Sequence, residues 1–171
     1  LRPAARGLSG IPIAVWLLCA LALAVWTLAA FEPLRHATAR NAIYAVMGVC
    51  QSVNLLLISA ETALEFGLPA PFARWSMPLH MAFDLFTAAA MLHASCVHPR
   101  RLPGAGWIAL AGWSVVLALL LAWNLGLLPN AWWLTQGTVI ALLAIGIGLL
   151  SWSYRIEPHP FAIVLRQFGI V

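Results

Sequence analysis

Apolar residues occupy five long runs along the chain, and short segments rich in proline, glycine and arginine separate them. The runs cover residues 11–31, 42–66, 77–97, 106–128 and 131–154. About 20 apolar residues suffice for a helix to cross a bilayer, and a backbone in lipid must satisfy its own hydrogen bonds. The pattern therefore predicts an all-α fold, a single membrane domain built as a polytopic bundle of about five transmembrane helices with short loops.

Two neighbouring runs each carry a polar stripe. In the second run, side chains recur at alternating spacings of three and four residues, namely Tyr44, Met47, Gln51, Asn54, Ile58, Glu61 and Glu65. The third run shows the same spacing in Met77, His80, Asp84, Thr87, Met91, Ala94 and His98. Residues three and four apart lie on one face of a helix, so each set is expected to form one continuous stripe.

The segment from Gly67 to Pro71 is expected to fold these two helices antiparallel, because proline and glycine favour turns. Glu61 lies six residues before Gly67, and His80 lies six residues after Arg74. At a rise of 1.5 Å per residue, each is expected to lie ~9 Å from the end of its helix at the turn. The stripes should therefore face each other.

We predict a ligand- or proton-binding site where the two stripes meet. Its candidate residues are Glu61, Glu65, His80, Asp84, Gln51 and Asn54. An ionisable side chain at mid-membrane costs roughly 2.5–3.5 kcal/mol on insertion scales, so such groups mark functional sites. The alternative interpretation is a hydrogen-bonded cluster that only fixes the register of the helices.

Composition and charge support a membrane location. Of 171 residues, 63% are hydrophobic and 8% charged, against about 25% charged in soluble domains. All nine basic residues are arginine, which is typical of a GC-rich bacterial gene. The loops expected on one side carry six arginines and the other side three, which predicts a bacterial inner-membrane protein with a cytoplasmic C-terminus. Arginines in loops indicate the lipid bilayer as partner and no nucleic acid.

Tryptophan and glycine also have membrane interpretations. An aromatic belt at the membrane interface is the expected role of Trp75, Trp107, Trp132, Trp133 and Trp152, which fall near the ends of runs. Close packing of helices is the expected role of Gly112, Gly137, Gly146 and Gly148.

Metal and haem sites are further alternatives, but the sequence does not identify a particular cofactor. His80 with Asp84 four residues later has the spacing of a ligand pair, and Glu61 and Glu65 would add oxygen ligands. His80 and His93 are thirteen residues apart, a spacing similar to that of membrane cytochromes that hold two haems. The other runs lack partner histidines, so a haem site would require a homodimer.

The sequence contains no nucleophile elbow and no phosphate-binding loop, so we expect no catalytic activity within this chain. Because residue 1 is leucine, we expect that the chain derives from a longer product. The tail from Tyr154 to Val171 is expected to lead onward, either into a further span or into a downstream domain.

The layout resembles the multi-span sensor region of bacterial two-component histidine kinases, in its short loops, its ionisable cluster and its outgoing tail. The resemblance implies signal transduction through a downstream signalling domain. Three functional hypotheses follow: a membrane-embedded sensory or ligand-binding module that uses a polar cavity between the second and third runs, a proton- or cation-coupled transporter or channel subunit, and a metal- or haem-binding redox subunit.

Overall fold

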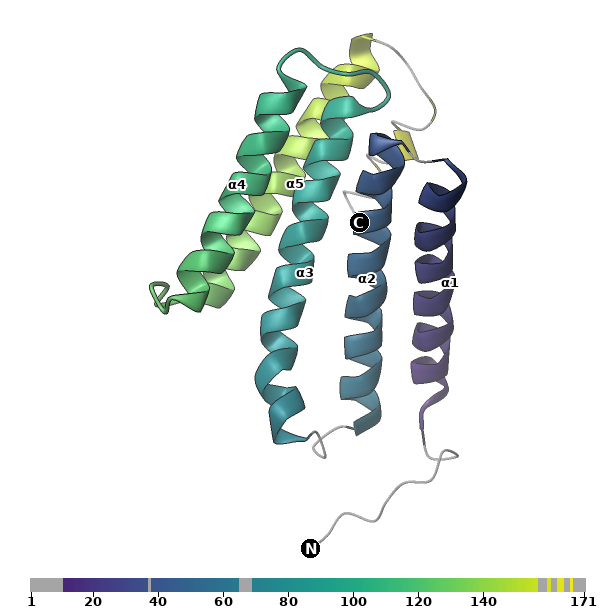
Figure 1. The fold of residues 1–171 in the computed structure, drawn as a ribbon, viewed down its shortest axis with the longest axis vertical. Helices are drawn as coiled ribbons and strands as arrows, with labels where there is room; N and C mark the ends of the chain where they lie inside the picture. The colour runs from purple at the N-terminus through teal and green to yellow at the C-terminus, as the bar shows by residue number, and fades with distance from the viewer. Residues whose placement is uncertain are drawn as a thin grey trace, which may run out of the picture.

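The computed structural model describes residues 11–36, 38–64 and 69–156, together with residues 160, 163, 164 and 167. Within these residues the fold is all-helical, as predicted (Figure 1). Its elements are α1 (Ile13–Arg35), α2 (Ala39–Leu64), α3 (Ala70–Val97), α4 (Ala105–Asn124) and α5 (Ala131–Ile156). Four of them, α1, α2, α4 and α5, are long and apolar enough to cross a membrane, which makes this a multi-pass membrane protein.

Helix α3 is not among those four, although it has 28 residues. It is instead the central helix, because it packs against α2, α4 and α5. Among the described residues, α1 contacts only α2, and α2 has no contact with α4 or α5. Since its neighbours cover α3 on several sides, this helix can carry polar side chains that a lipid-facing helix would not tolerate.

Several helix boundaries differ from the sequence prediction, since α1 extends to Arg35, α2 begins at Ala39, and the start of α3 and the end of α4 also shift. The third helix was expected from residue 77, but α3 begins at Ala70, with Pro69 as its N-cap. Proline is compatible with the first turn of a helix, where its missing N–H has no partner to lose. The fourth helix was expected to reach residue 128, but α4 ends at Asn124. Gly126 has a φ of 69°, and its N–H donates to the Trp123 carbonyl, which ends the helix in a glycine cap.

The main core lies where α3 meets α4 and α5. It is formed by Leu85, Ala88, Ala89, Leu92, Val116 and Leu142. Two of the predicted packing glycines line this interface. A Cβ atom added to Gly112 would lie 2.7 Å from Leu92 Cδ2, and one added to Gly146 would lie 3.2 Å from Ser95 Oγ. For Gly137 and Gly148 the prediction was wrong, because nothing lies within 4 Å of an added Cβ.

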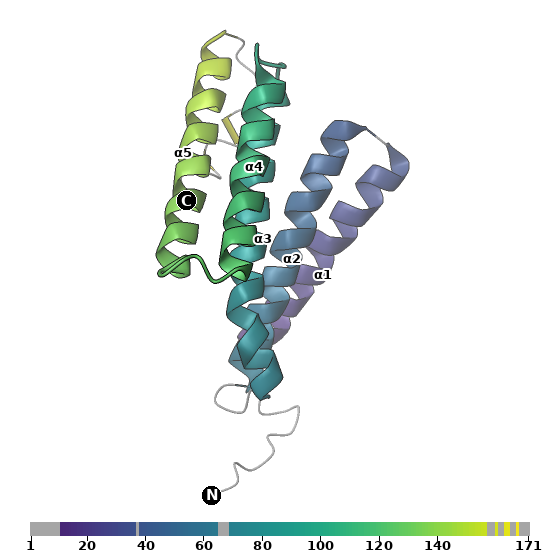
Figure 2. The same cartoon turned by 60° about the vertical axis from the view of Figure 1, so that its left-hand side comes forward.

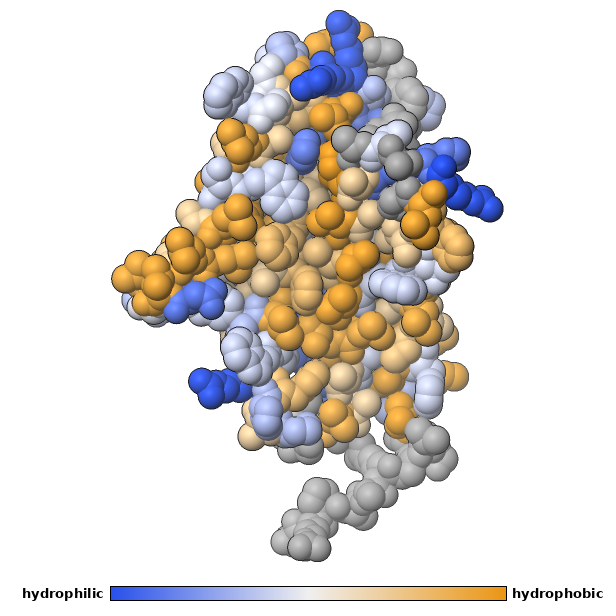
Figure 3. Space-filling model, viewed as in Figure 1, coloured by the Kyte–Doolittle hydropathy of each residue, from blue (hydrophilic) through white to orange (hydrophobic). Residues whose placement is uncertain are grey.

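The helices are staggered along the long axis of the bundle. The turn between α4 and α5 lies beside the middle of α3, whereas the N-terminal half of α3 extends beyond it (Figures 1 and 2). Helix α2 packs along that extension. Apolar side chains cover the middle of the surface, and strongly hydrophilic ones gather toward its ends (Figure 3). The stagger leaves one part of the α2–α3 interface uncovered by the α4–α5 pair.

Candidate functional site

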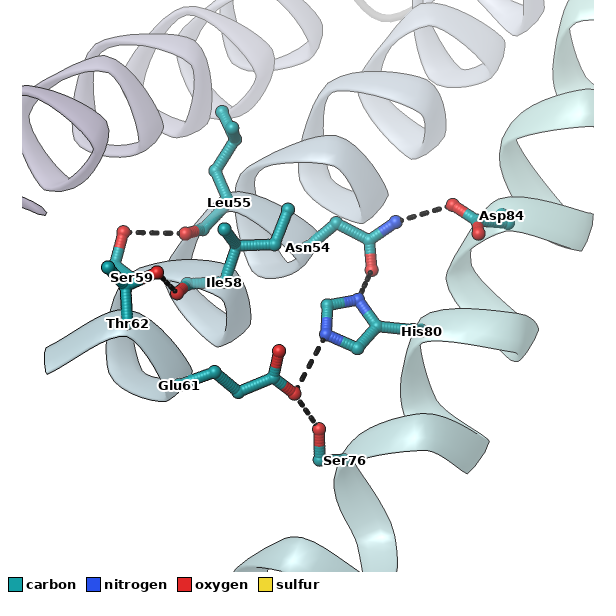
Figure 4. Close-up of polar contacts among 9 residues, drawn as sticks. All are labelled: Asn54, Leu55, Ile58, Ser59, Glu61, Thr62, Ser76, His80 and Asp84. Atoms are coloured by element: carbon teal, nitrogen blue, oxygen red, sulfur yellow. Dashed lines mark hydrogen bonds and ion pairs between the residues drawn. The ribbon is translucent and has the colours of Figure 1, made fainter. Parts of the chain in front are cut away.

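The polar stripes of α2 and α3 face each other, as the sequence predicted. Figure 4 shows Asn54 and Glu61 of α2 directed at His80 and Asp84 of α3. The periodicity explains this arrangement, because Asn54 and Glu61 are seven residues apart and lie two turns apart on one helix face. The prediction that Glu61 and His80 lie at matching depth is confirmed by their contact of 3.2 Å.

A continuous chain of hydrogen bonds joins the two helices. Ser76 Oγ donates to Glu61 Oε1, and the same oxygen lies 3.2 Å from His80 Nε2. The other ring nitrogen, His80 Nδ1, lies 3.1 Å from Asn54 Oδ1. Asn54 Nδ2 in turn donates to Asp84 Oδ1 over 2.7 Å. Five side chains therefore form one connected network, in which Asn54 occupies the position between the imidazole and the Asp84 carboxylate.

Past Asp84, toward the C-terminal end of α3, the α2–α3 interface holds one more polar pair and then becomes apolar. Gln51 Nε2 donates to Thr87 Oγ1 over 3.1 Å, one turn beyond Asp84. Past that pair, the interface becomes an apolar cluster of Ile43, Ala90 and Ala94, on which Met47 packs. The connected polar network thus occupies one end of the α2–α3 pair, while Tyr44 and His98 lie edge to face at the other end, with ring centroids 6.5 Å apart.

Burial decreases along the network from Asn54 to Glu61. Asn54 is 6% exposed, whereas the side chains of His80 and Glu61 are 19% and 34% exposed. The gradient fits the stagger of the helices, because the turn between α4 and α5 lies beside the middle of α3 and the N-terminal half of α3 extends beyond it (Figure 1). Asn54 is thus enclosed by protein, whereas His80 and Glu61 are accessible from outside the bundle; Ser76, which donates to Glu61, is itself buried.

The accessible end opens into a cavity of about 510 Å³, which we call the polar groove. Its polar lining consists of Gln51, Asn54, Glu61, Ser76, His80 and Asp84. Its apolar lining consists of Leu55, Ile58, Met77 and Trp132. Five of the six predicted site residues therefore line one cavity. The sixth, Glu65, lies outside the described residues.

Two groove residues were missed by the sequence analysis. Ser76 is four residues before His80 and so continues the α3 stripe, but it precedes the predicted start of that helix. Trp132 was assigned to an aromatic belt; it is 43% exposed but also lines the groove from α5. Gln136, one turn further along α5, lies close enough to interact with the Asp84 carboxylate. The polar side chain of Gln136 within an apolar run was the sequence signal that could have identified it.

His93 lies in a different environment from His80. Its Nδ1 accepts a hydrogen bond of 3.3 Å from Trp113 Nε1 of α4. His80 faces α2 and His93 faces α4, so they do not present one common face for two haems in a homodimer. Among the described residues, no three His, Cys, Asp or Glu side chains are placed to hold a metal ion, so the predicted His80–Asp84 ligand pair lacks a third such partner.

The chain matches no protein-family model, and neither the curated proteins nor the solved structures yielded a match to it.

Proposed function

We propose that this protein is a membrane-embedded sensory or ligand-binding module whose polar groove takes a small molecule with a positive charge or hydrogen-bond donor and an apolar body. The observation that carries the proposal is the groove itself, since the ionisable side chains line an accessible cavity instead of a closed interface. A polar cluster that only fixed the register of the helices would need the same hydrogen bonds but no cavity.

The size and lining of the groove support a small-molecule ligand. Its volume of about 510 Å³ falls within the 300–1,000 Å³ typical of ligand pockets. Two carboxylates and one imidazole line it, so the groove carries negative charge whenever both carboxylates are ionised. Leu55, Ile58 and Trp132 offer apolar contact on other sides. This combination favours a cationic head with an apolar body, and an indole ring also attracts cations.

The distribution of arginine supports access from outside the cell. Arg35, Arg100, Arg101 and Arg155 lie at or beyond the C-terminal ends of α1, α3 and α5, at one end of the bundle, and Arg74 lies at the other. Arginine-rich ends favour the cytoplasmic side. The groove is near the Arg74 end, so it would open outward in a bacterial inner membrane whose cytoplasmic side holds the C-terminus.

Helix α3 offers a route for a signal. Its N-terminal half lines the groove, and its C-terminal half forms the core with α4 and α5 through Leu85, Ala88 and Leu92. A ligand that binds differently to two packing arrangements of α2 and α3 shifts the balance between them. The shift would reach the arginine-rich end through α3, and a downstream signalling domain beyond Val171 stays a prediction.

A second candidate is proton or cation transfer, which the connected network from Ser76 to Asp84 favours. The apolar cluster of Ile43, Ala90 and Ala94 opposes it, because the network would have to cross this cluster to reach the other side. A proton moving that way would lose its hydrogen-bonded partners. Binding within the groove therefore accounts for the polar residues better than passage through the bundle.

The proposal is tested by binding of 4-fluorobenzylammonium to the protein in lipid nanodiscs, followed by ¹⁹F NMR. The variants Glu61→Gln and Asp84→Asn should each weaken binding by about tenfold, which corresponds to ~1.4 kcal/mol. Thr62→Val is the matched control, because the Thr62 hydroxyl bonds the Ile58 carbonyl of its own helix. 4-Fluorobenzyl alcohol, which has the same body without the charge, measures partition into lipid.

Equal binding of the cation by the wild type and by the Glu61→Gln/Asp84→Asn double variant would overturn the proposal. Proton flux into proteoliposomes distinguishes the second candidate. Flux in the wild type that is lost in the same double variant would favour transfer over ligand binding.

A further inference from the structure

Both ring nitrogens of His80 lie against oxygen atoms. Nδ1 is 3.1 Å from Asn54 Oδ1, and Nε2 is 3.2 Å from Glu61 Oε1. A neutral imidazole has one N–H donor, whereas the imidazolium has two. With the Asn54 amide oriented as it is and Glu61 ionised, both contacts are hydrogen bonds only when His80 is charged.

The orientation of the Asn54 amide is linked to the protonation of Asp84. As described, Nδ2 donates to Asp84 Oδ1 over 2.7 Å, which suits an ionised carboxylate. If Asp84 holds a proton, its hydroxyl needs an acceptor, and a half-turn of the amide presents Asn54 Oδ1 to it. The same half-turn presents Nδ2 to Nδ1 of a neutral His80. An amide has both donors and acceptors, so it can serve either arrangement.

We propose that Asn54 is a positioning residue that couples the charge of Asp84 to the charge of His80, so that the groove exchanges between two forms with the same number of protons. In the charged form, Asp84 is a carboxylate and His80 an imidazolium. In the neutral form, the proton has left His80 Nδ1 and a proton has joined Asp84 Oδ1, while His80 Nε2–H still donates to Glu61. Every hydrogen bond of the network is retained in both forms.

The polarity of the groove decides between the two forms. In water, an imidazole binds a proton more tightly than a carboxylate does, which favours the charged form there. Removal of water favours the form in which neither group is charged. His80 is 19% exposed, so protons can exchange through water in the groove. Among the described residues, Glu61 is the other ionisable group that faces this pair, and α5 contributes the uncharged Trp132 and Gln136.

This inference rests on the proposed function for its use, because an occupant that expels water from the groove would convert the charged form into the neutral one. The change would remove an opposite-charge pair on α3, His80 and Asp84, while the net charge and the proton count of the groove stay the same. Ligand occupancy would thereby be converted into a change in charge separation beside α2.

The coupling is tested without a ligand, in hydrated lipid films of the protein at controlled humidity. Infrared spectroscopy measures the carbonyl band of protonated Asp84, identified by its loss in Asp84→Asn. ¹⁵N NMR of labelled histidine measures the His80 imidazolium, identified by its loss in His80→Gln. As water is removed, one protonated Asp84 should appear for each imidazolium lost. Asn54→Leu should abolish this one-to-one relation, whereas Thr62→Val, which removes a hydroxyl that bonds the Ile58 carbonyl of its own helix, should retain it.

A wild-type Asp84 band that does not change with humidity, or that changes without the His80 signal, would overturn the coupling. Retention of the one-to-one relation in Asn54→Leu would show that Asn54 has no part in it. The binding experiment separates the two proposals. If the coupling is intact but 4-fluorobenzylammonium shows no charge-dependent binding, only the ligand-binding function is refuted. If binding is intact but the coupling is absent, only the present inference is refuted.

Discussion

Replacement of Asn54 by leucine should destabilise the bundle more than any comparable loss of an amide on α2. Asn54 is 6% exposed and bonds two ionisable side chains of α3. An interhelical hydrogen bond in a membrane protein contributes about 0.6 kcal/mol, so two bonds contribute ~1.2 kcal/mol. Loss of a partner for a buried polar group adds about 1 kcal/mol at the low end, which applies here because water reaches the groove.

The expected cost of Asn54→Leu is therefore about 2 kcal/mol in the free energy of unfolding. The matched control is Gln51→Leu on the same helix. Gln51 is exposed and donates a hydrogen bond to the neutral Thr87 hydroxyl, so its loss should cost about 0.6 kcal/mol. Both variants gain the same leucine side chain, which makes their difference informative.

The assay is reversible unfolding in lipid bicelles by titration with a denaturing detergent, followed by the helical circular dichroism signal. The difference between the two variants should be about 1.4 kcal/mol, a tenfold change in the unfolding equilibrium. If Asn54→Leu is no more destabilising than Gln51→Leu, Asn54 does not connect the two helices in the way that its contacts indicate.

Further predictions concern the helix packing and the groove boundary. Gly48→Ala should cost about 1–3 kcal/mol of stability, because its Cβ would lie 2.6 Å from the rigid Cβ of Ala29 on α1. The control is Gly148→Ala, because nothing lies within 4 Å of its added Cβ. This control should cost nothing or stabilise the protein by up to about 1 kcal/mol. Equal effects in detergent unfolding would contradict the packing of α1 on α2. His93→Ala should cost about 1 kcal/mol through its lost bond to Trp113, yet leave 4-fluorobenzylammonium affinity within about twofold. A larger loss of affinity would place His93 in the binding site.

The pairing of α2 with α3 could be predicted because hydrophobic and polar positions follow the helical period. Asn54, Glu61, His80 and Asp84 were assigned to the facing stripes by spacing alone, and their contacts confirm the assignment. The depth estimate reached the correct pair from an incorrect helix start, because α3 begins at Ala70. The periodicity within each helix, and not the length of the turn, determines which residues meet.

The start of α3 was missed because glycine and proline between residues 67 and 71 suggested a turn there. Pro71 lies in the first turn, where no N–H partner is lost, and Pro78 lies inside the helix. Pro78 removes a donor for the carbonyl of Arg74. Arg74 is exposed, so water or lipid headgroups can satisfy that carbonyl. Hydropathy alone does not distinguish this case from a helix break.

The opening of the polar groove could not be predicted from periodicity. It depends on how far the α4–α5 pair is displaced along α3, which is set by the packing of Gly112 and Gly146 against Leu92 and Ser95. That displacement brings Trp132 to the level of the network and leaves the Glu61 end uncovered. A stripe analysis treats each helix separately and carries no information about the stagger between helix pairs.

The most direct test of the central claim is a double-mutant cycle across Glu61 and His80, with Glu61→Gln, His80→Gln and the double variant unfolded in bicelles. Residues in contact within one hydrogen-bond network show coupling of about 0.5–3 kcal/mol. The contact of 3.2 Å between His80 Nε2 and Glu61 Oε1 predicts coupling of at least ~0.5 kcal/mol. Additive effects, with coupling near zero, would mean that the two side chains do not meet and that α2 and α3 do not form a shared polar site.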